Sequence, residues 1–238
     1  MNRNFAAVIF DLDDTLHNDT HAYQSAACEI AEAIAAERSG VDAHALFEAF
    51  IAHTSRYWSA LSAEHLNMPI AESRYELWGS ALRDVGITDD ATIRKVAQRY
   101  GECRRKYYSP FPGALELLGT LRERGKKLGL ITNGFAETHY EKLELLGLQS
   151  SFDAILCADE VGMVKPDPKI FLHACELLDT PPARAAMVGD RYFRDIVGAR
   201  EAGLFTVYIS MHAEKIPQGQ TPDVTVKGIE EVLAILLP

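Results

Sequence analysis

Residues 6–15 of the chain read AAVIFDLDDT, and no other stretch is as informative. The first five residues are apolar, with β-branched and aromatic side chains that predict a short buried strand. The next five carry three carboxylates, at Asp11, Asp13 and Asp14. Because like charges at close range repel, this cluster needs a neutralising partner, and a hard divalent cation is the simplest one. The carboxyl end of a parallel strand is also where α/β proteins place their active sites.

Length and composition indicate a soluble globular protein. The chain has 238 residues, of which 47% are hydrophobic and 24% charged, enough to bury a core of ordinary size. The net charge of -10 argues against non-specific binding to nucleic acid or to an anionic membrane surface. No apolar stretch reaches transmembrane length and no signal-peptide pattern is visible, so we expect a cytoplasmic protein. The four cysteines form no CxxC pair, so nothing suggests a zinc site.

Two parts of the chain, residues 1–16 and 111–238, alternate short apolar runs with amphipathic patterns. This alternation is typical of an α/β domain with a parallel sheet. Strands are expected over residues 6–10, 127–131, 153–157, 185–188 and 204–209, with a weaker one near 223–226. Helices are expected over residues 113–124, 136–147, 168–178, 193–202 and 228–236.

The intervening segment, residues 17–110, shows no convincing strand. Apolar residues at helical spacing predict four helices, near residues 20–38, 43–61, 70–84 and 90–107. Asp42 is expected to cap the second helix, and Asp89 or Asp90 the fourth. An all-helical block directly after the first strand suggests a cap domain that covers the end of that strand.

Polar clusters stand where four of the predicted α/β elements meet their loops. They are Asp11-x-Asp13-x-Thr15, Thr132-Asn133-Gly134, Lys165-Pro166-Asp167-Pro168, and Gly189-Asp190 with Asp195 five residues on. In an open α/β sheet, strand ends converge on one crevice, so residues far apart in sequence can share a site. Each cluster alone is weak evidence of function, whereas the four in this order are specific.

In this order the clusters resemble the motifs of the haloacid dehalogenase superfamily. The residues that carry the resemblance are Asp11, Asp13, Thr15, Thr132, Lys165, Asp190 and Asp195. The resemblance spans the whole chain and is strongest to the phosphatase branch with a helical cap. It implies an α/β fold, with a doubly wound parallel Rossmann-like sheet and an inserted helical-bundle cap.

The resemblance also implies catalytic roles. Asp11 would attack phosphorus and form an aspartyl-phosphate, and Asp13 would protonate the leaving oxygen and then activate water. For both to reach the substrate, the backbone must coil just after Asp11. Lys165 would neutralise the phosphate and the nucleophile. The residues expected to bind the substrate phosphate are Leu12, Asp13, Thr132, Asn133 and Lys165.

A magnesium ion is the cofactor that the resemblance implies. Its ligands would be Asp11, Asp190 and the carbonyl of Asp13. Thr15 would support the turn, and Asp195 would support the metal through water or orient Lys165. The site would hold three ionised carboxylates, those of Asp11, Asp190 and Asp195, with Asp13 protonated and Lys165 as the one cation. A bound phosphate dianion then leaves four net negative charges, and Mg²⁺ reduces them to two. One unit pair at 4 Å is worth about 4 kcal/mol at an effective dielectric near 20, so we expect strict metal dependence.

The expected function is therefore Mg²⁺-dependent hydrolysis of a small phosphomonoester, either a nucleoside monophosphate or a sugar phosphate. Alternatives are a phosphomutase, which would return the phosphoryl group to a sugar, a haloacid dehalogenase, or a binding protein that has lost turnover. The carboxylate at Asp13 disfavours a dehalogenase, since those members of the superfamily lack it.

Several residues have no assigned role at this stage. Arg191 follows Asp190 and is expected either to contact the substrate or to pair with a carboxylate. His17 and His21 are expected to be solvated or to face the substrate rather than to bind a metal. In the helical segment Tyr57, Trp58, Arg74 and Trp78 either face the substrate or fill helix interfaces.

Overall fold

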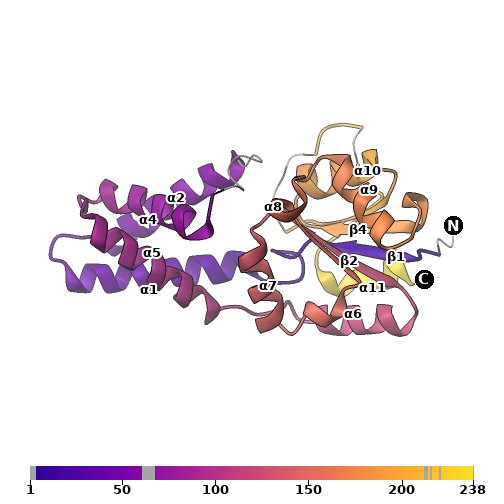
Figure 1. The fold of residues 1–238 in the computed structure, drawn as a ribbon, viewed down its shortest axis with the longest axis horizontal. Coiled ribbons are helices and arrows are strands. Elements are labelled where there is room, and N and C mark those ends of the chain that lie inside the picture. Colours follow the sequence, from indigo (N-terminus) through magenta and orange to yellow (C-terminus); the bar gives the residue numbers. More distant parts are fainter. Residues whose placement is uncertain (1–3, 61–67, 212–213, 215, 220, 238) are drawn as a thin grey trace. The chain divides into compact units, whose positions relative to one another are not determined.

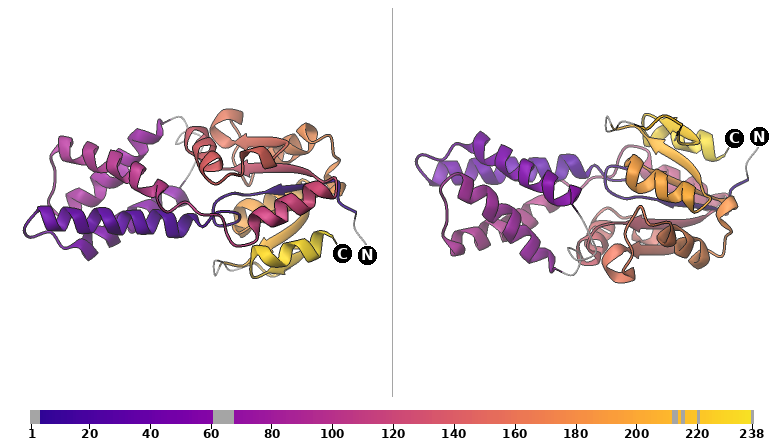
Figure 2. Two further views of the ribbon diagram at one scale, coloured as in Figure 1. Left: turned by 90° about the horizontal axis from the view of Figure 1, so that it is seen from below. Right: turned by 90° about the horizontal axis from the view of Figure 1, so that it is seen from above.

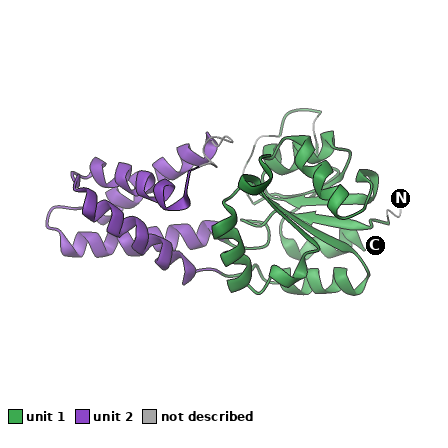
Figure 3. Ribbon diagram, viewed as in Figure 1, with its two compact units in different colours: residues 1–18, 109–238 green, residues 19–108 purple. Residues whose placement is uncertain are grey.

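The computed structural model describes residues 4–60, 68–211, 214, 216–219 and 221–237. It divides the chain into two compact units (Figure 3). The α/β unit comprises residues 1–18 and 109–238, and the helical unit comprises residues 19–108. Among the described residues, no helix combines the length and the apolar character needed to cross a membrane.

The α/β unit is built on one six-stranded sheet in which every strand pair is parallel. Its strands are β1 (Ala7–Phe10), β2 (Lys127–Thr132), β3 (Ala154–Cys157), β4 (Ala185–Gly189), β5 (Phe205–Ile209) and β6 (Val224–Val226). They lie in the order β3-β2-β1-β4-β5-β6. The predicted doubly wound α/β fold is thereby confirmed, since the chain winds from β1 first to one side and then to the other.

Helices cover both faces of this sheet. Figures 1 and 2 show α6 (Ala114–Glu123) and α11 (Val232–Leu236) on one side, and α9 (Pro168–Leu177) and α10 (Gly198–Glu201) on the other. The remaining helices of the unit are α7 (Ala136–Leu145) and the short α8 (Ala158–Val161). Because both faces are covered, all four residues of β1 are fully buried. This burial explains why the sequence of the strand is a continuous apolar run rather than an alternation of apolar and polar residues.

Two predicted helices of the α/β unit differ from expectation. The one expected over residues 193–202 begins as a π-helix, η3 (Tyr192–Val197), before it continues as α10. The last begins as a 3₁₀ turn, Ile229–Glu231, that leads into α11. The short α8 was not predicted, because four residues are too few to establish a helical period. Its end is set by Gly162, which has a positive φ of 67°.

The helical unit contains α1 (Asp19–Glu37), α2 (Ala43–Ser59), α4 (Ile70–Asp84) and α5 (Asp90–Arg105). As predicted, the carboxylate of Asp42 caps α2 by accepting the Ala45 amide at 2.9 Å. Asp89, rather than Asp90, caps α5 by accepting the Thr92 amide at 2.9 Å. The predicted end of the second helix at residue 61 lies outside the described residues.

Aromatic side chains form the centre of the helical unit. Trp78 is fully buried and stacks on Phe50, with ring centroids 4.2 Å apart, and Tyr100 meets both rings edge-on. Trp78 therefore packs inside the bundle and does not face a substrate. Tyr57 and Trp58 are only half-buried and meet each other at their edges.

We predict that Trp78→Ala lowers the free energy of unfolding by about 3 to 5 kcal/mol, because it opens a cavity at the centre of the helical unit. Chemical denaturation followed by circular dichroism measures the loss. Trp58→Ala is the matched control, and its half-buried ring should cost clearly less. Equal losses for the two variants would show that Trp78 does not organise this core.

Candidate active site

Three adjacent strands bring the predicted polar clusters to one edge of the sheet. β1 pairs with β2 on one side and with β4 on the other, so Asp11, Thr132 and Asp190 stand at neighbouring strand ends. The Asp11 amide continues the ladder by donating to the Val188 carbonyl at 3.0 Å. Strands β2 and β3 lie on one side of β1, and the later strands β4 to β6 lie on the other. The point at which the strand order reverses is where open α/β sheets bind ligands.

The backbone coils directly after Asp11, as expected. The carbonyl of Leu12 accepts the amides of Thr15, Leu16 and His17, at 3.3, 2.9 and 3.1 Å. Asp14 takes a positive φ of 60°, a conformation that Asp tolerates better than most residues. The side chain of Leu12 is fully buried, so a phosphate contact from this residue would come from its main chain.

Lys165 lies between two carboxylates. Its Nζ is 2.5 Å from Oδ1 of Asp11 and 2.6 Å from Oδ1 of Asp195, and all three residues are buried. Burial by itself works against the ammonium, but the carboxylates of Asp11 and Asp195 raise the pKa of Lys165 above its ordinary value. Asp195 therefore makes the contact that is needed to orient Lys165, one of the two roles expected for it.

The main chain of Lys165 is held by Asn133. The Asn133 side chain donates to the Lys165 carbonyl at 2.8 Å and accepts the Lys165 amide at 2.7 Å. The side-chain amide of Asn133 thus uses both its oxygen and its nitrogen to hold the main chain of Lys165. Thr132 is buried, and its Oγ1 accepts the Gly134 amide at 3.1 Å, which leaves the hydroxyl proton available for donation.

Asp11, Asp190 and Asp195 form a buried acidic cluster. One carboxylate oxygen from each lies within 4.8 Å of the others, an arrangement suited to a hard cation. Burial raises the pKa of Asp11 well above its ordinary value, with Lys165 opposing the shift and the carboxylates of Asp195 and Asp190 adding to it. A cation bound to this cluster would favour the ionised form of Asp11.

Asp190 is held from two sides. The hydroxyl of Thr15 donates to its Oδ1 at 3.0 Å, so the Thr15 side chain ties the loop after β1 to the end of β4. The Nε of Arg191 lies 3.2 Å from its Oδ2, and the same guanidinium is within 3.6 Å of Asp14 and 3.8 Å of Glu214. Arg191 therefore pairs with carboxylates, and Lys165 is not the one cation beside the acidic cluster, contrary to our initial count.

Asp13 lies in different surroundings from Asp11. Its Oδ1 accepts from Nζ of Lys142 at 2.6 Å, and its Oδ2 is 3.2 Å from Nε2 of His139. Its carboxylate does not belong to the acidic cluster of Asp11, Asp190 and Asp195, so a contact from Asp13 to a metal ion in that cluster would come from its carbonyl. The contacts of Lys142 and His139 with Asp13 were not predicted from the sequence. Their spacing of three on the helix after Thr132-Asn133-Gly134 was the available signal, because such residues share a helix face.

His17 contradicts the expectation of a solvated side chain. It is fully buried, and its Nδ1 lies 2.9 Å from the carbonyl of Ser109. The contact joins the two chain segments at which the α/β unit meets its insertion. His17 thus has a structural partner within the α/β unit.

A glycine allows Asp195 to approach the end of β4. A Cβ atom at Gly189 would overlap the side chain of Asp195, whose Oδ2 also accepts the Arg191 amide at 2.9 Å. The π-helix η3 begins here, and insertions of this kind are frequent at functional sites. Gly189 is therefore needed for Asp195 to reach Lys165.

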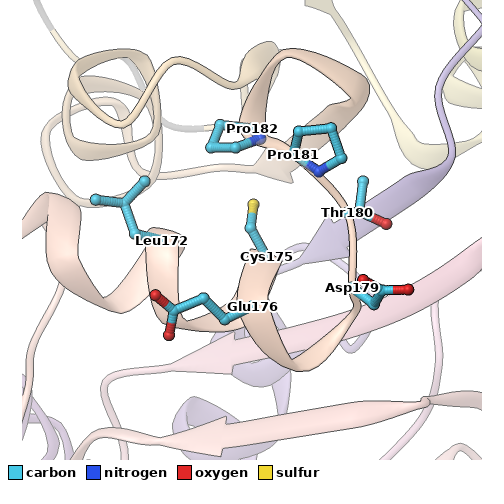
Figure 4. A pocket seen from close by; sticks show the side chains of 7 residues that line it. All are labelled: Leu172, Cys175, Glu176, Asp179, Thr180, Pro181 and Pro182. Carbon is cyan, nitrogen blue, oxygen red and sulfur yellow. The ribbon is translucent and has the colours of Figure 1, made fainter.

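A surface pocket lies away from these residues (Figure 4). It is formed by the last turns of α9 and the segment that follows, with Leu172, Cys175, Glu176, Asp179, Thr180, Pro181 and Pro182 as its lining. Lys127, the first residue of β2, donates to the Leu178 carbonyl beside it at 2.7 Å. The pocket therefore lies where strands begin, at the opposite end of β2 from Thr132.

Comparisons with known proteins agree on one family. The family pattern of haloacid dehalogenase-like hydrolases matches residues 5–203. The pyrimidine 5'-nucleotidase YjjG of Escherichia coli (strain K12) is 34% identical over 172 residues, which are 71% of this chain and 72% of that protein. The glyceraldehyde 3-phosphate phosphatase of Methanopyrus kandleri is 34% identical over 212 residues, 85% and 83% of the two chains. The crystal structure of a HAD phosphatase from Thermococcus onnurineus has a TM-score of 0.64 and 25% identity, covering 97% of each chain.

We predict that Gly189→Ala removes most of the activity while the protein stays folded, because the added methyl group displaces Asp195 from Lys165. Turnover and thermal unfolding are measured on the same preparation. Gly119→Ala, at an open position in α6, is the control and should keep full activity with equal or slightly greater stability. Wild-type turnover by Gly189→Ala would contradict the role given to this close approach.

Proposed function

The chain belongs to the haloacid dehalogenase-like hydrolases and is a phosphatase, and from this premise we propose Mg²⁺-dependent hydrolysis of a small phosphomonoester through an aspartyl-phosphate on Asp11. The observation that carries the proposal is the contact of Lys165 with Asp11 and Asp195. These residues come from three separate segments of the chain and meet at adjacent strand ends.

In the proposed first step, an oxygen of Asp11 attacks the phosphorus atom. A phosphorus–oxygen bond forms to Asp11 as the bond to the leaving alcohol breaks, and Asp13 supplies the proton that the leaving oxygen takes up. In the second step, Asp13 accepts a proton from water, and the water oxygen attacks phosphorus. The bond to Asp11 then breaks, which releases inorganic phosphate and restores the carboxylate.

The other residues of the site bind and orient. Lys165 carries positive charge to the nucleophile and to the phosphate, and Asp195 fixes its position. Thr132 donates its hydroxyl proton to a phosphate oxygen, and the main chain at Leu12 and Asn133 provides further donors. Donors that are already in place stabilise the charge of the transition state without having to reorganise.

The acidic cluster fits a magnesium ion, because it gathers buried oxygen donors that repel one another. Asp11, Asp190 and the carbonyl of Asp13 would hold the ion. When bound, it would polarise the phosphoryl oxygens and neutralise charge on the phosphate. When Arg191 is included together with Asp14 and Glu214, which the same guanidinium also approaches, five carboxylates and two cations leave three net negative charges, and a phosphate dianion raises this to five. Substrate binding therefore still requires additional positive charge.

The substrate class is proposed to be a nucleoside monophosphate or a sugar phosphate. Two relatives support this range, since one is named for pyrimidine nucleotides and the other for glyceraldehyde 3-phosphate. The helical unit is proposed to act as the cap that selects the leaving group, as closure over a site excludes bulk water.

We predict phosphate release from at least one nucleoside monophosphate or sugar phosphate when Mg²⁺ is supplied, and from an aryl phosphate such as p-nitrophenyl phosphate. Exhaustive chelation should abolish turnover, and Mg²⁺ should restore it, because the site carries excess negative charge. Asp11→Asn is the control for contaminating phosphatases and should be inactive. Full turnover after chelation, or product interconversion or halide release in place of phosphate release, would overturn the proposal.

We also predict that Asp13→Asn slows turnover by about 10²- to 10⁴-fold, the usual contribution of a general acid–base group. Metal affinity, measured by calorimetry, should change little, because the Asp13 carboxylate lies outside the acidic cluster. Near-normal turnover by this variant would exclude Asp13 from proton transfer.

A further inference from the structure

One buried cation of the α/β unit has no part in the reaction described above. Lys142 lies on α7 and is only 1% exposed, yet it carries an ammonium group. Burying a charge is costly unless it is paired, so a lysine in this position needs a specific partner. Its Nζ lies 2.6 Å from Oδ1 of Asp13, the residue proposed to transfer protons.

A second residue of the same helix contacts the other oxygen of Asp13. Nε2 of His139 lies 3.2 Å from Oδ2 of Asp13, and Nδ1 of the same ring lies 3.0 Å from the carbonyl of Phe135. Gly134 makes room for the ring, because a Cβ atom there would overlap it. The imidazole is therefore fixed by its own helix, and α7 holds the Asp13 carboxylate at both oxygens.

Asp13 needs such support because of where it stands. It belongs to a coiled loop whose following residue, Asp14, has a positive φ, and its side chain remains 31% exposed. An unsupported carboxylate in that position would sample several rotamers. Proton transfer requires hydrogen-bond distance to the reacting oxygen, and a displacement of about 1 Å can cost 10²-fold in rate.

We propose that Lys142 is a positioning residue that acts through Asp13, holding its carboxylate in the orientation from which it activates the water that hydrolyses the aspartyl-phosphate. The inference rests on the proposed function. In this step the water proton goes to Asp13, the water oxygen bonds to phosphorus, and the bond between phosphorus and Asp11 breaks. His139 assists by holding the second oxygen of the same carboxylate.

The proposal is tested by Lys142→Met, which keeps the length of the side chain and removes its charge. With p-nitrophenyl phosphate, whose leaving group needs no protonation, the phosphoenzyme should still form, but its hydrolysis should slow by about 10- to 100-fold. We expect kcat and KM to fall together, so that kcat/KM, which reports formation of the phosphoenzyme, changes little, and we expect the aspartyl-phosphate to accumulate in rapid-quench samples. Lys227→Met removes the same charge from an exposed position and should behave as wild type.

A double-mutant cycle separates action through Asp13 from an independent effect. In an Asp13→Asn background, Lys142→Met should cause little further loss, since its target is already disabled. Thermal unfolding checks that each variant is folded. Lys142→Gln, which removes the charge but retains a hydrogen-bond donor, is measured in parallel; it should slow the same step to a smaller extent, and it tests the proposal if Lys142→Met does not fold.

Several outcomes would overturn the inference. Unchanged kcat, a rise in KM alone, or losses that multiply fully with those of Asp13→Asn would each show that Lys142 does not position Asp13. A rise in KM alone would instead indicate direct substrate binding. If the wild-type protein released no phosphate from any ester tested, the proposed function itself would fail. If the wild-type protein released phosphate and Lys142→Met released it equally fast, only the role given to Lys142 would fail.

Discussion

The ammonium of Lys165 between the carboxylates of Asp11 and Asp195 is the interaction on which the rest of the site depends. Three buried acids cannot be gathered at one strand end unless positive charge is brought to them, because their repulsion in a poorly solvated place is large. The surroundings serve this contact. Asn133 fixes the main chain of Lys165, and Gly189 leaves the space that Asp195 occupies. Removing one partner would leave a buried charge uncompensated.

The architecture explains why these charges meet where they do. The central strands β1 and β4 are buried along their whole length and carry no polar side chain, so polar side chains are accommodated at their ends. β1 lies between β2 and β4, and the chain diverges from it in both directions. Asp11, Thr132 and Asp190 therefore stand side by side although they are far apart in sequence, and helices cannot cover the point at which the winding reverses.

Asp11 and Asp13, which both follow β1, have separate electrostatic surroundings. Asp11 shares buried space with Asp190 and Asp195, whereas the Asp13 carboxylate is held by Lys142 and His139 of α7. Such a division suits two groups that are proposed to differ in task, one a nucleophile and the other a proton carrier, since environment sets how each carboxyl behaves.

Sequence alone determined the strand pattern, the sheet class, the four helices expected within residues 17–110 and the candidate residues at strand ends, because these follow from local periodicity and from carboxylates that need compensation. Only the tertiary structure decided which side chains meet. The contact of His17 with Ser109, the pairing of Arg191 with Asp14 and the contacts of α7 with Asp13 each join residues that no local pattern links. Contacts of this kind depend on how packed elements aim their side chains, and periodicity specifies the face of a helix but not its neighbour across the fold.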